Sequence, residues 1–190
     1  MLGKGIVLVL SLVSASAFAN WSVDNDTSRV NFTSVKKGSV AEAHYFKSIT
    51  GTLSNQGQFT LVADLNSVET LIPIRNERMK KYLFETATYP KLTVTADLAK
   101  SLQGLKANKP QIITVPAKVS LHGVDKSENI TVLVHKDSAN TITVSSVMPV
   151  IVTAADFNLV AGVQQLQKIA KLSSIATAIP VNFSLTLKAN

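Results

Sequence analysis

The chain has no cysteine, and that absence excludes several classes of protein. A sequence of 190 residues without cysteine forms no disulfide, so burial of apolar side chains must stabilise the fold. The same absence excludes thiol redox chemistry, iron–sulfur clusters and zinc sites built on cysteine. Lipid attachment to a cysteine behind an N-terminal leader is excluded as well.

Long apolar runs are lacking beyond the N-terminus. Lys4, the apolar stretch 5–13 and the small-x-small site Ala17-Phe18-Ala19 predict a signal peptide over residues 1–19, followed by a single domain over residues 20–190. The apolar stretch is too short to span a bilayer, and no later segment approaches the ~20 apolar residues that a spanning helix needs. We therefore expect an exported protein, with a bacterial periplasm as its destination.

Negative charge is scarce. The chain carries 19 Lys and Arg against 12 Asp and Glu, a net charge of +7. Nucleic acid is not expected as a partner, because export separates the chain from it and no aromatic–basic binding motif is present. The excess charge favours solubility, or transient contact with an anionic membrane surface, where each basic residue adds ~1 kcal/mol. The basic residues that gather in one segment are Arg75, Arg78, Lys80, Lys81 and Lys91.

Catalytic and metal-binding motifs are also missing. The histidines His44, His122 and His135 form no HxH or HxxxH pair. The sequence has no Gly-x-Ser-x-Gly elbow and no Gly-rich phosphate loop. We therefore predict no catalytic residue, no metal and no cofactor. An enzyme or a haem or redox accessory protein acting on an apolar substrate stays the alternative.

The sequence does contain period-two alternation of apolar and polar residues from end to end. Such spacing predicts an all-β protein of about eight antiparallel strands, each with one dry face. Turn signals between the strands are Gly51, Asn55-Gln56-Gly57, the stretch 104–110, His122-Gly123 and the stretch 137–140. The predicted inward positions are Val30, Phe32, Phe59, Leu61, Ala63, Leu65, Leu92, Val94, Ala96, Leu98, Ile113, Val115, Ala117, Val119, Leu121, Ile130, Val132, Val134, Ile142, Val144, Ile179, Val181, Phe183, Leu185 and Leu187.

One antiparallel sheet with a single dry face must close on itself or pack on a second sheet. A barrel of about eight strands leaves an interior that side chains fill or that holds one small ligand. An integral outer-membrane barrel is disfavoured, because aromatic residues make up only 6% of the chain and the outward positions are Thr, Ser, Lys and Asn.

Two amphipathic helices are predicted between the strands. The first covers residues 72–85, with Pro73 in its first turn, and an ideal helix places Met79, Tyr82 and Leu83 on one apolar side with Arg75 among them. An arginine on an apolar face must find an acceptor or reach water. The second helix covers residues 160–172. Its apolar stripe consists of Val163, Leu166, Ile169 and Ala170.

Four separated motifs resemble the YceI-like polyisoprenoid-binding family. They are Thr70 with Arg75-Asn76, Met79, Phe84 and Tyr89-Pro90; the strand and turn 118–126; Ala155-Asp156-Phe157; and the opening strand pattern 21–32. The chain departs from the family pattern at Asn76, where Asp is usual, at Ala154, where a basic residue is common, and at Asn158, where Gly is common. Asparagine tolerates a positive φ better than most residues, so the backbone at Asn158 is not in conflict with the family.

The resemblance implies a lipocalin-like up-and-down β-barrel with one or two short helices at its mouth. It also implies a long isoprenoid ligand, either a polyprenyl lipid or an isoprenoid quinone, bound for carriage, sequestration or stress protection. Arg75 is the first choice for contact with the ligand head group, followed by His44 and Tyr82, and a structural bond from Arg75 to nearby carbonyls is the alternative. The candidate ligand-binding residues are Phe32, His44, Phe46, Arg75, Met79, Tyr82, Leu83, Phe84, Val94, Val119, Leu121, Phe157 and Phe183.

Overall fold

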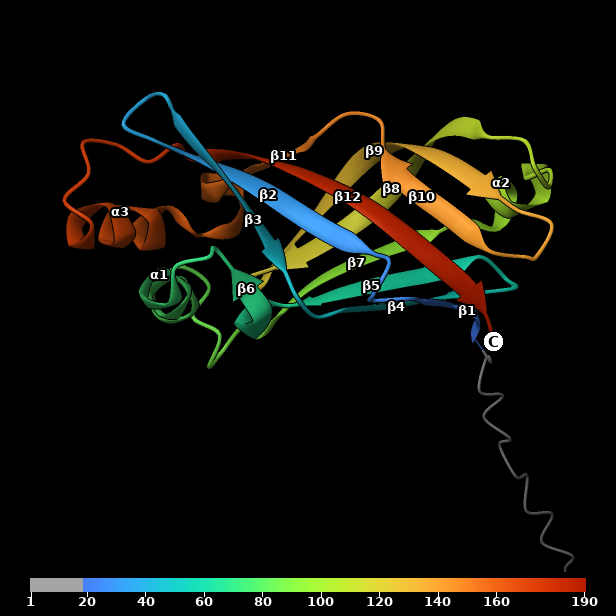
Figure 1. The fold of residues 1–190 in the computed structure, drawn as a ribbon, viewed down its shortest axis with the longest axis horizontal. Helices are drawn as coiled ribbons and strands as arrows, with labels where there is room; N and C mark the ends of the chain where they lie inside the picture. The colour runs from blue at the N-terminus through green and yellow to red at the C-terminus, as the bar shows by residue number, and fades with distance from the viewer. Residues whose placement is uncertain (1–18) are drawn as a thin grey trace, which may run out of the picture.

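Twelve strands form one sheet that closes into a β-barrel in the computed structural model, which describes residues 19–190 (Figure 1). The predicted signal peptide thus lies outside the described residues except for its last one. The strands are β1 (Ala19–Val23), β2 (Arg29–Lys36), β3 (Val40–Phe46), β4 (Ile49–Ser54), β5 (Gln58–Asp64), β6 (Val68–Glu69), β7 (Lys91–Asp97), β8 (Gln111–Leu121), β9 (Val124–Lys136), β10 (Ile142–Ser146), β11 (Val150–Thr153) and β12 (Ala178–Ala189). The helices are η1 (Leu65–Ser67), α1 (Pro73–Arg78), the π-helical η2 (Met79–Leu83), α2 (Ala99–Gly104), η3 (Ala154–Phe157) and α3 (Val160–Ile169).

The closed ring has eight strands, as the alternation predicts. Its order is β1–β4–β5–β7–β8–β9–β10–β12, and the antiparallel pair of β1 with β12 completes it. Strands β1 and β2 occupy the same place in the ring one after the other, because both pair antiparallel with β12. Strands β3 and β4 likewise share the next place, since β4 pairs with β1 and β3 pairs with β2. Apart from β2, β3, β6 and β11, which are not among these eight strands, the strands follow one another around the ring in chain order. This is the up-and-down topology that the family resemblance implies.

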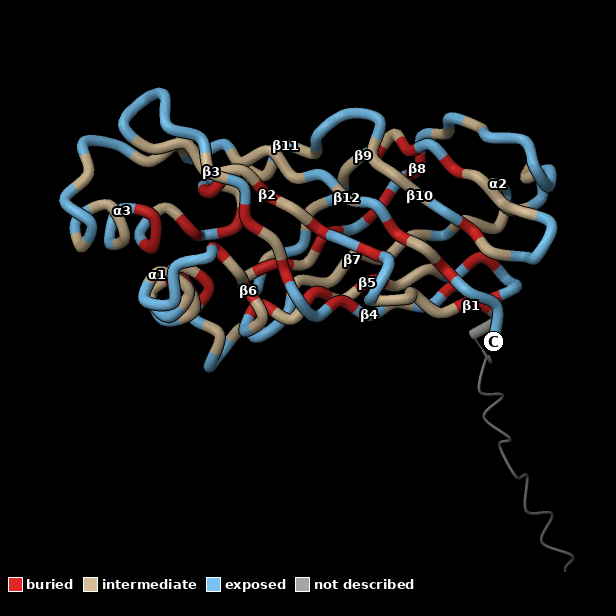
Figure 2. The backbone as a smooth tube through the Cα atoms, in the orientation of Figure 1, coloured by how far each residue is buried: buried red, intermediate tan, exposed pale blue. Residues whose placement is uncertain are grey.

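Buried and exposed residues alternate along strands such as β8 and β9, as predicted (Figure 2). Every predicted inward position lines the central cavity except Ala63, which is fully buried in the wall. Strand β12 shows the pattern over its greatest length, from Ile179 to Leu187. The hydrogen-bonded ladders fix this register, because a slip of one residue would turn each apolar face toward water.

The turn predicted at Gly51 is wrong. Gly51 lies inside β4 and pairs with Leu61 of β5. A Cβ at Gly51 would stand 2.8 Å from the Thr60 carbonyl oxygen and 2.8 Å from Cγ2 of Val23, so the glycine allows close approach of neighbouring strands. Glycine inside a strand often marks the close approach of another backbone. The chain instead bends at Lys47 and Ser48, between β3 and β4.

The helices lie at the two ends of the barrel. Helices α1 and α3 stand together at one end and α2 at the other (Figure 1). Of the first predicted helix, Pro73–Arg78 is α-helical and Met79–Leu83 is π-helical, with the Phe84 N–H donating to the Met79 carbonyl at 2.9 Å. Asn158 has φ +57°, so it takes the positive φ that the sequence allows. Within residues 19–190, no helix combines the length and the apolar character required to cross a membrane.

The contact between α3 and η2 gives a test of this end of the fold. A Cβ at Gly162 of α3 would lie 2.6 Å from the Tyr82 carbonyl oxygen and 2.8 Å from the Leu83 Cα. Because backbone atoms cannot move aside, Gly162→Ala should lower the free energy of unfolding by about 1–3 kcal/mol in urea titrations. Gly104→Ala is the control, since nothing lies within 4 Å of its Cβ position, and it should leave stability unchanged or slightly raised. Equal stability of the two variants would contradict the docking of α3 on η2.

Candidate functional site

An elongated cavity of about 540 Å³ fills the inside of the barrel. Close-packed protein cores contain few voids larger than a water molecule. Pockets for small ligands, in contrast, measure roughly 300–1,000 Å³. Inward side chains of the strands form most of the wall, and apolar residues dominate it from Leu105 and Ile142 at the α2 end to Ile72 and Ile175 at the α1 end.

The polar side chains of the wall gather at one end, which we call the mouth. The mouth lies between α1, the β2–β3 hairpin and the segment after α3, and apart from Ser101 it holds all the polar wall residues. They are Ser34, Lys36, Glu42, His44, Arg75 and Arg78. Three wall residues here are exposed, Ile72, Ile74 and Ala170, so the cavity reaches the surface at this end.

Arg75 links the helix to the strands at the mouth. Its guanidinium donates to Glu42 Oε2 at 2.7 Å and to the Thr70 carbonyl oxygen at 2.6 Å. Its Nε is buried and has no hydrogen-bond partner in the described part of the chain. Arg75 therefore makes the structural bond that the sequence leaves open, and one N–H donor beside the cavity is still unused.

Glu42 receives a second cation from the neighbouring strand. Lys36 Nζ lies 2.8 Å from Glu42 Oε2. The hydrogen bond from Lys36, followed by the charge of Arg75, keeps the pKa of the Glu42 carboxyl below its usual value. The carboxylate therefore stays ionised near neutral pH and joins β2, β3 and α1 through Lys36 and Arg75.

His44 lies deeper than Arg75 and is 2% exposed. Its Nε2 is 2.8 Å from Ser34 Oγ, while its buried Nδ1 has no partner among residues 19–190. Burial, followed by the positive charge of Arg75, lowers the pKa of His44 from 6.5 to about 4. The ring is therefore neutral at pH 7, and its centroid stands 5.1 Å from that of Phe32. A neutral ring with a free polar atom is suited to an uncharged partner.

The structure brings together eleven of the thirteen candidate ligand-binding residues on the cavity wall. Arg75 and His44 are at the mouth. The remaining residues contribute apolar surface, namely Phe32, Phe46, Met79, Leu83, Phe84, Val94, Val119, Leu121 and Phe183.

Tyr82 does not line the cavity, and the π-helix is the reason. The hydrogen bond from Phe84 to Met79 reaches back five residues, so the chain turns less per residue than in an α-helix. Leu83 and Phe84 therefore share the inward side with Met79, and Tyr82 rotates away, with Lys81 Nζ 5.1 Å from its ring centroid.

Phe157 is buried but also lies off the cavity wall. It belongs to η3, which packs against β9 and β11. These two strands are not paired with each other, since β9 pairs with β10 and β11 pairs with β12. Phe157 thus stabilises the place where the sheet separates instead of contacting the cavity.

Sequence reasoning missed the mouth residues Ser34, Lys36 and Glu42. The signal was present in the alternation: Ser34 and Lys36 continue the inward positions of Phe32, and Glu42 precedes His44 and Phe46 by steps of two. The register places Ser34 opposite Glu42 and Phe32 opposite His44. The sequence also does not predict helix α2, which ends where the predicted turn 104–110 begins and places Leu102 on the wall at the far end, with Leu105 just after it.

Comparisons with known proteins agree with this geometry. The family model for the YceI-like domain matches residues 21–187. A solved polyisoprenoid-binding domain from Saccharophagus degradans, implicated in plant cell wall breakdown, is 40% identical with a TM-score of 0.87, covering 91% of this chain and 100% of that domain. BcnA of Burkholderia cenocepacia is 20% identical with a TM-score of 0.67, covering 86% of this chain and 98% of its own. A YCEI protein of Campylobacter jejuni is 15% identical with a TM-score of 0.54, and the match covers 75% of this chain and 82% of that protein. Among curated proteins, no relative is found.

Arg75 should matter more than the exposed cations of its helix. Arg75→Ala removes one of the two cations at Glu42 and the donor to Thr70, so the free energy of unfolding should fall by about 1–3 kcal/mol. Lys81→Ala should stay within about 0.5 kcal/mol of wild type, as exposed substitutions do. Chemical denaturation of both variants measures this. Equal stability would show that the Arg75–Glu42 pair contributes nothing to the fold.

His44 should make stability depend on pH in a defined window. Between pH 6.5 and pH 4 the unfolded chain binds a proton at this residue while the folded protein does not, so stability falls as the pH drops through that range. His44→Gln should flatten the curve of urea midpoint against pH there. The further loss below pH 4.5 should remain, because carboxyls such as Glu69 have a lowered pKa in the folded protein. An unchanged slope between pH 6.5 and pH 4 would contradict the neutral state of His44.

Proposed function

Because the chain belongs to the YceI-like family, we propose that it is an exported binding protein that holds a long isoprenoid in its barrel. The ligand is a polyprenyl lipid or an isoprenoid quinone, its chain lies in the cavity, and its head group lies at the mouth. The family match, together with the polyisoprenoid-binding domain that shares 40% identity with this chain, supports the ligand class.

The observation that carries the proposal is the distribution of polarity along the cavity. An isoprenoid lipid has a long apolar chain and a small polar head, and the cavity has an apolar length and one polar end. Each buried CH₂ contributes ~0.8 kcal/mol, so the chain can be bound tightly without specific polar contacts. The head group would then decide which way the ligand enters.

The unused polar atoms at the mouth favour a head group without a strong charge. Arg75 Nε–H can donate to a carbonyl or hydroxyl oxygen, and His44 Nδ1 offers a second polar contact from a neutral ring. The Arg75 guanidinium is already paired with Glu42. A quinone carbonyl or a prenol hydroxyl is therefore a better fit than an anionic group, which would meet the Glu42 carboxylate.

Export to the periplasm supports a carrier or sequestering role. The basic, apolar and small-x-small pattern over residues 1–19 is that of a secretory signal peptide. An isoprenoid chain is nearly insoluble in an aqueous compartment, so a dry cavity is a means of moving or storing it there. We propose binding instead of catalysis, since the residues at the mouth serve contact and orientation.

Blocking the cavity tests the proposal directly. Ala117 lines the wall of β8, and a phenyl ring at this position would project into the cavity. Ala117→Phe should reduce binding of a long-chain ubiquinone or polyprenol at least about tenfold while leaving the fold intact, because the ring removes the space for several CH₂ groups. Native mass spectrometry and organic extraction of the mature protein after incubation with each lipid measure this.

Two matched variants complete the experiment. Thr114→Phe places the same ring on the outer face of the same strand and should bind like wild type. Phe183→Asp should lose both binding and stability, because an unpaired carboxylate in an apolar cavity is costly. If the wild-type protein takes up neither lipid, or Ala117→Phe binds as well as Thr114→Phe, then the cavity is not the binding site.

A further inference from the structure

We propose that the mouth docks on an anionic lipid bilayer through an exposed apolar tip, residues 71–74, so that the ligand passes between bilayer and cavity without crossing water. The identity of the transferred ligand, an isoprenoid, rests on the proposed function, whereas the docking rests on the exposed surface of the mouth alone. The tip consists of Leu71, Ile72, Pro73 and Ile74, between β6 and the first turns of α1.

The tip exposes a contiguous apolar surface. Leu71 is 79% exposed, Ile74 57% and Ile72 43%. Three large apolar side chains within four residues differ from apolar residues that are exposed singly, which are normal on any surface. Contiguous apolar patches of this kind typically mark interaction sites for membranes or proteins.

The tip is continuous with the cavity. Ile72 and Ile74 line the wall at the mouth and are exposed at the same time. Leu71 adjoins them and does not line the cavity, so its side chain contributes to the outer surface alone. An apolar path therefore runs from the outside of the protein over Ile72 and Ile74 into the barrel, which is the path that a lipid chain leaving a bilayer would need.

A hydrogen-bond network holds Leu71 in its exposed place. Its backbone has φ +61°, in the left-handed region that a leucine rarely adopts. The Leu71 N–H donates to Glu69 Oε1 at 2.7 Å, and Asn76 Nδ2 donates to the same oxygen at 3.0 Å. Asn76 Oδ1 accepts from the backbone N–H and the hydroxyl of Thr70, at 2.9 Å and 2.6 Å. Gly or Asn would suit this backbone better, so folding does not require a leucine at this position.

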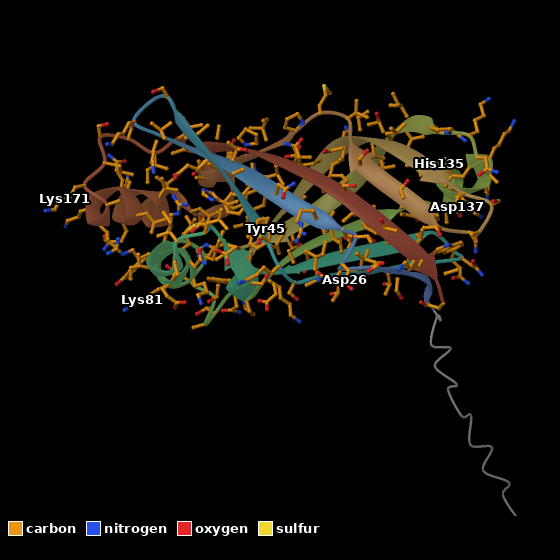
Figure 3. The ribbon with its side chains drawn as sticks, viewed as in Figure 1. Asp26, Tyr45, Lys81, His135, Asp137 and Lys171 are labelled. Atoms are coloured by element: carbon orange, nitrogen blue, oxygen red, sulfur yellow. The ribbon has the colours of Figure 1, made fainter. Side chains whose placement is uncertain are left out.

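Charge around the tip favours an anionic surface as the partner. The acidic residues of the mouth elements are paired, Glu42 with Lys36 and Arg75, Glu69 with Lys47, and Glu77 with Lys80. Cations at the same end have no carboxylate partner within residues 19–190, namely Lys37, Arg78, Lys81 and Lys171. Figure 3 shows Lys81 beside α1 and Lys171 beside α3, at the same end of the barrel.

This charge also distinguishes a bilayer from a second copy of the chain. Two mouths placed face to face would bring like charges together, whereas anionic lipid head groups attract each basic residue near the surface. Apolar side chains that enter the head-group region beneath such cations are the usual means by which proteins bind at a membrane interface.

Vesicle co-sedimentation of the full mature protein tests the docking. Wild type should bind vesicles of phosphatidylglycerol and phosphatidylcholine, and bind far less to phosphatidylcholine alone or at high salt. Leu71→Asn should weaken partitioning of the protein into anionic vesicles about tenfold, because the variant lacks the exposed apolar side chain that enters the bilayer. Asparagine tolerates the left-handed backbone, so the unfolding midpoint of this variant should equal or exceed that of wild type. Lys171→Gln should weaken binding to anionic vesicles only.

Ile112→Gln is the matched control, since Ile112 is 65% exposed on the outer face of β8. It lies at the start of β8, which follows α2 at the end of the barrel opposite the mouth. This variant should partition like wild type. Vesicle binding by Leu71→Asn equal to wild type would overturn the docking. So would sedimentation velocity that shows wild type as a dimer and Leu71→Asn as a monomer, since the tip would then be a self-interface.

Isoprenoid binding in detergent solution separates this inference from the proposed function. Leu71→Asn should bind a long-chain ubiquinone as wild type does in that assay, because Leu71 does not line the cavity. Normal isoprenoid binding with no vesicle binding would overturn the docking and leave the proposed function standing. Vesicle binding without isoprenoid uptake by wild type would uphold the docking and overturn the cargo.

Discussion

The apolar inner face of the barrel is the constraint on which the remainder of the structure depends. Because β8 and β12 alternate so regularly, each strand must turn one face away from water, and ring closure through β1 and β12 does this for all strands at once. Eight strands enclose more space than the inward side chains occupy, which leaves the cavity of about 540 Å³. The pairs that hold the ring closed thereby also create the cavity.

At the mouth, ion pairs and hydrogen bonds accommodate polar side chains at one end of the apolar inner face. Glu42 is satisfied by Lys36 and Arg75, and that pairing joins two strands to α1. Asn76, which replaces the usual Asp of the family, fits because its Nδ2 donates to Glu69 while its Oδ1 accepts from Thr70. An Asp at this position would have no donor for Glu69 and would face a second carboxylate, and the pKa of Glu69, held at about 2 by Asn76 and then Lys47, would rise.

The errors in sequence reasoning have physical causes that can be named. Tyr82 was placed on the cavity side by ideal helix geometry, but a π-helical turn rotates it outward. Gly51 reads as a turn residue, yet it serves close strand approach. Glu42 was overlooked because a carboxylate on the dry face of a strand is unexpected until its cationic partners are known. In each case the deciding contact comes from a residue that is distant in the sequence or from a local hydrogen-bond choice that spacing does not encode.

The sequence by itself determined the strand faces and two amphipathic helices, because alternation and helical spacing are local properties of the chain. Its four separated motifs determined the family, and that resemblance implied the up-and-down order and the helices at the mouth. Phe32, Val94 and Phe183 could be assigned to the interior on that basis. Only the tertiary structure decided that the interior holds a cavity, that its polar residues gather at one end, and that Leu71 is held outside. The reason is that volume left between strands, ion pairs such as Arg75 with Glu42, and exposure of a loop all arise from segments that meet only when the barrel closes.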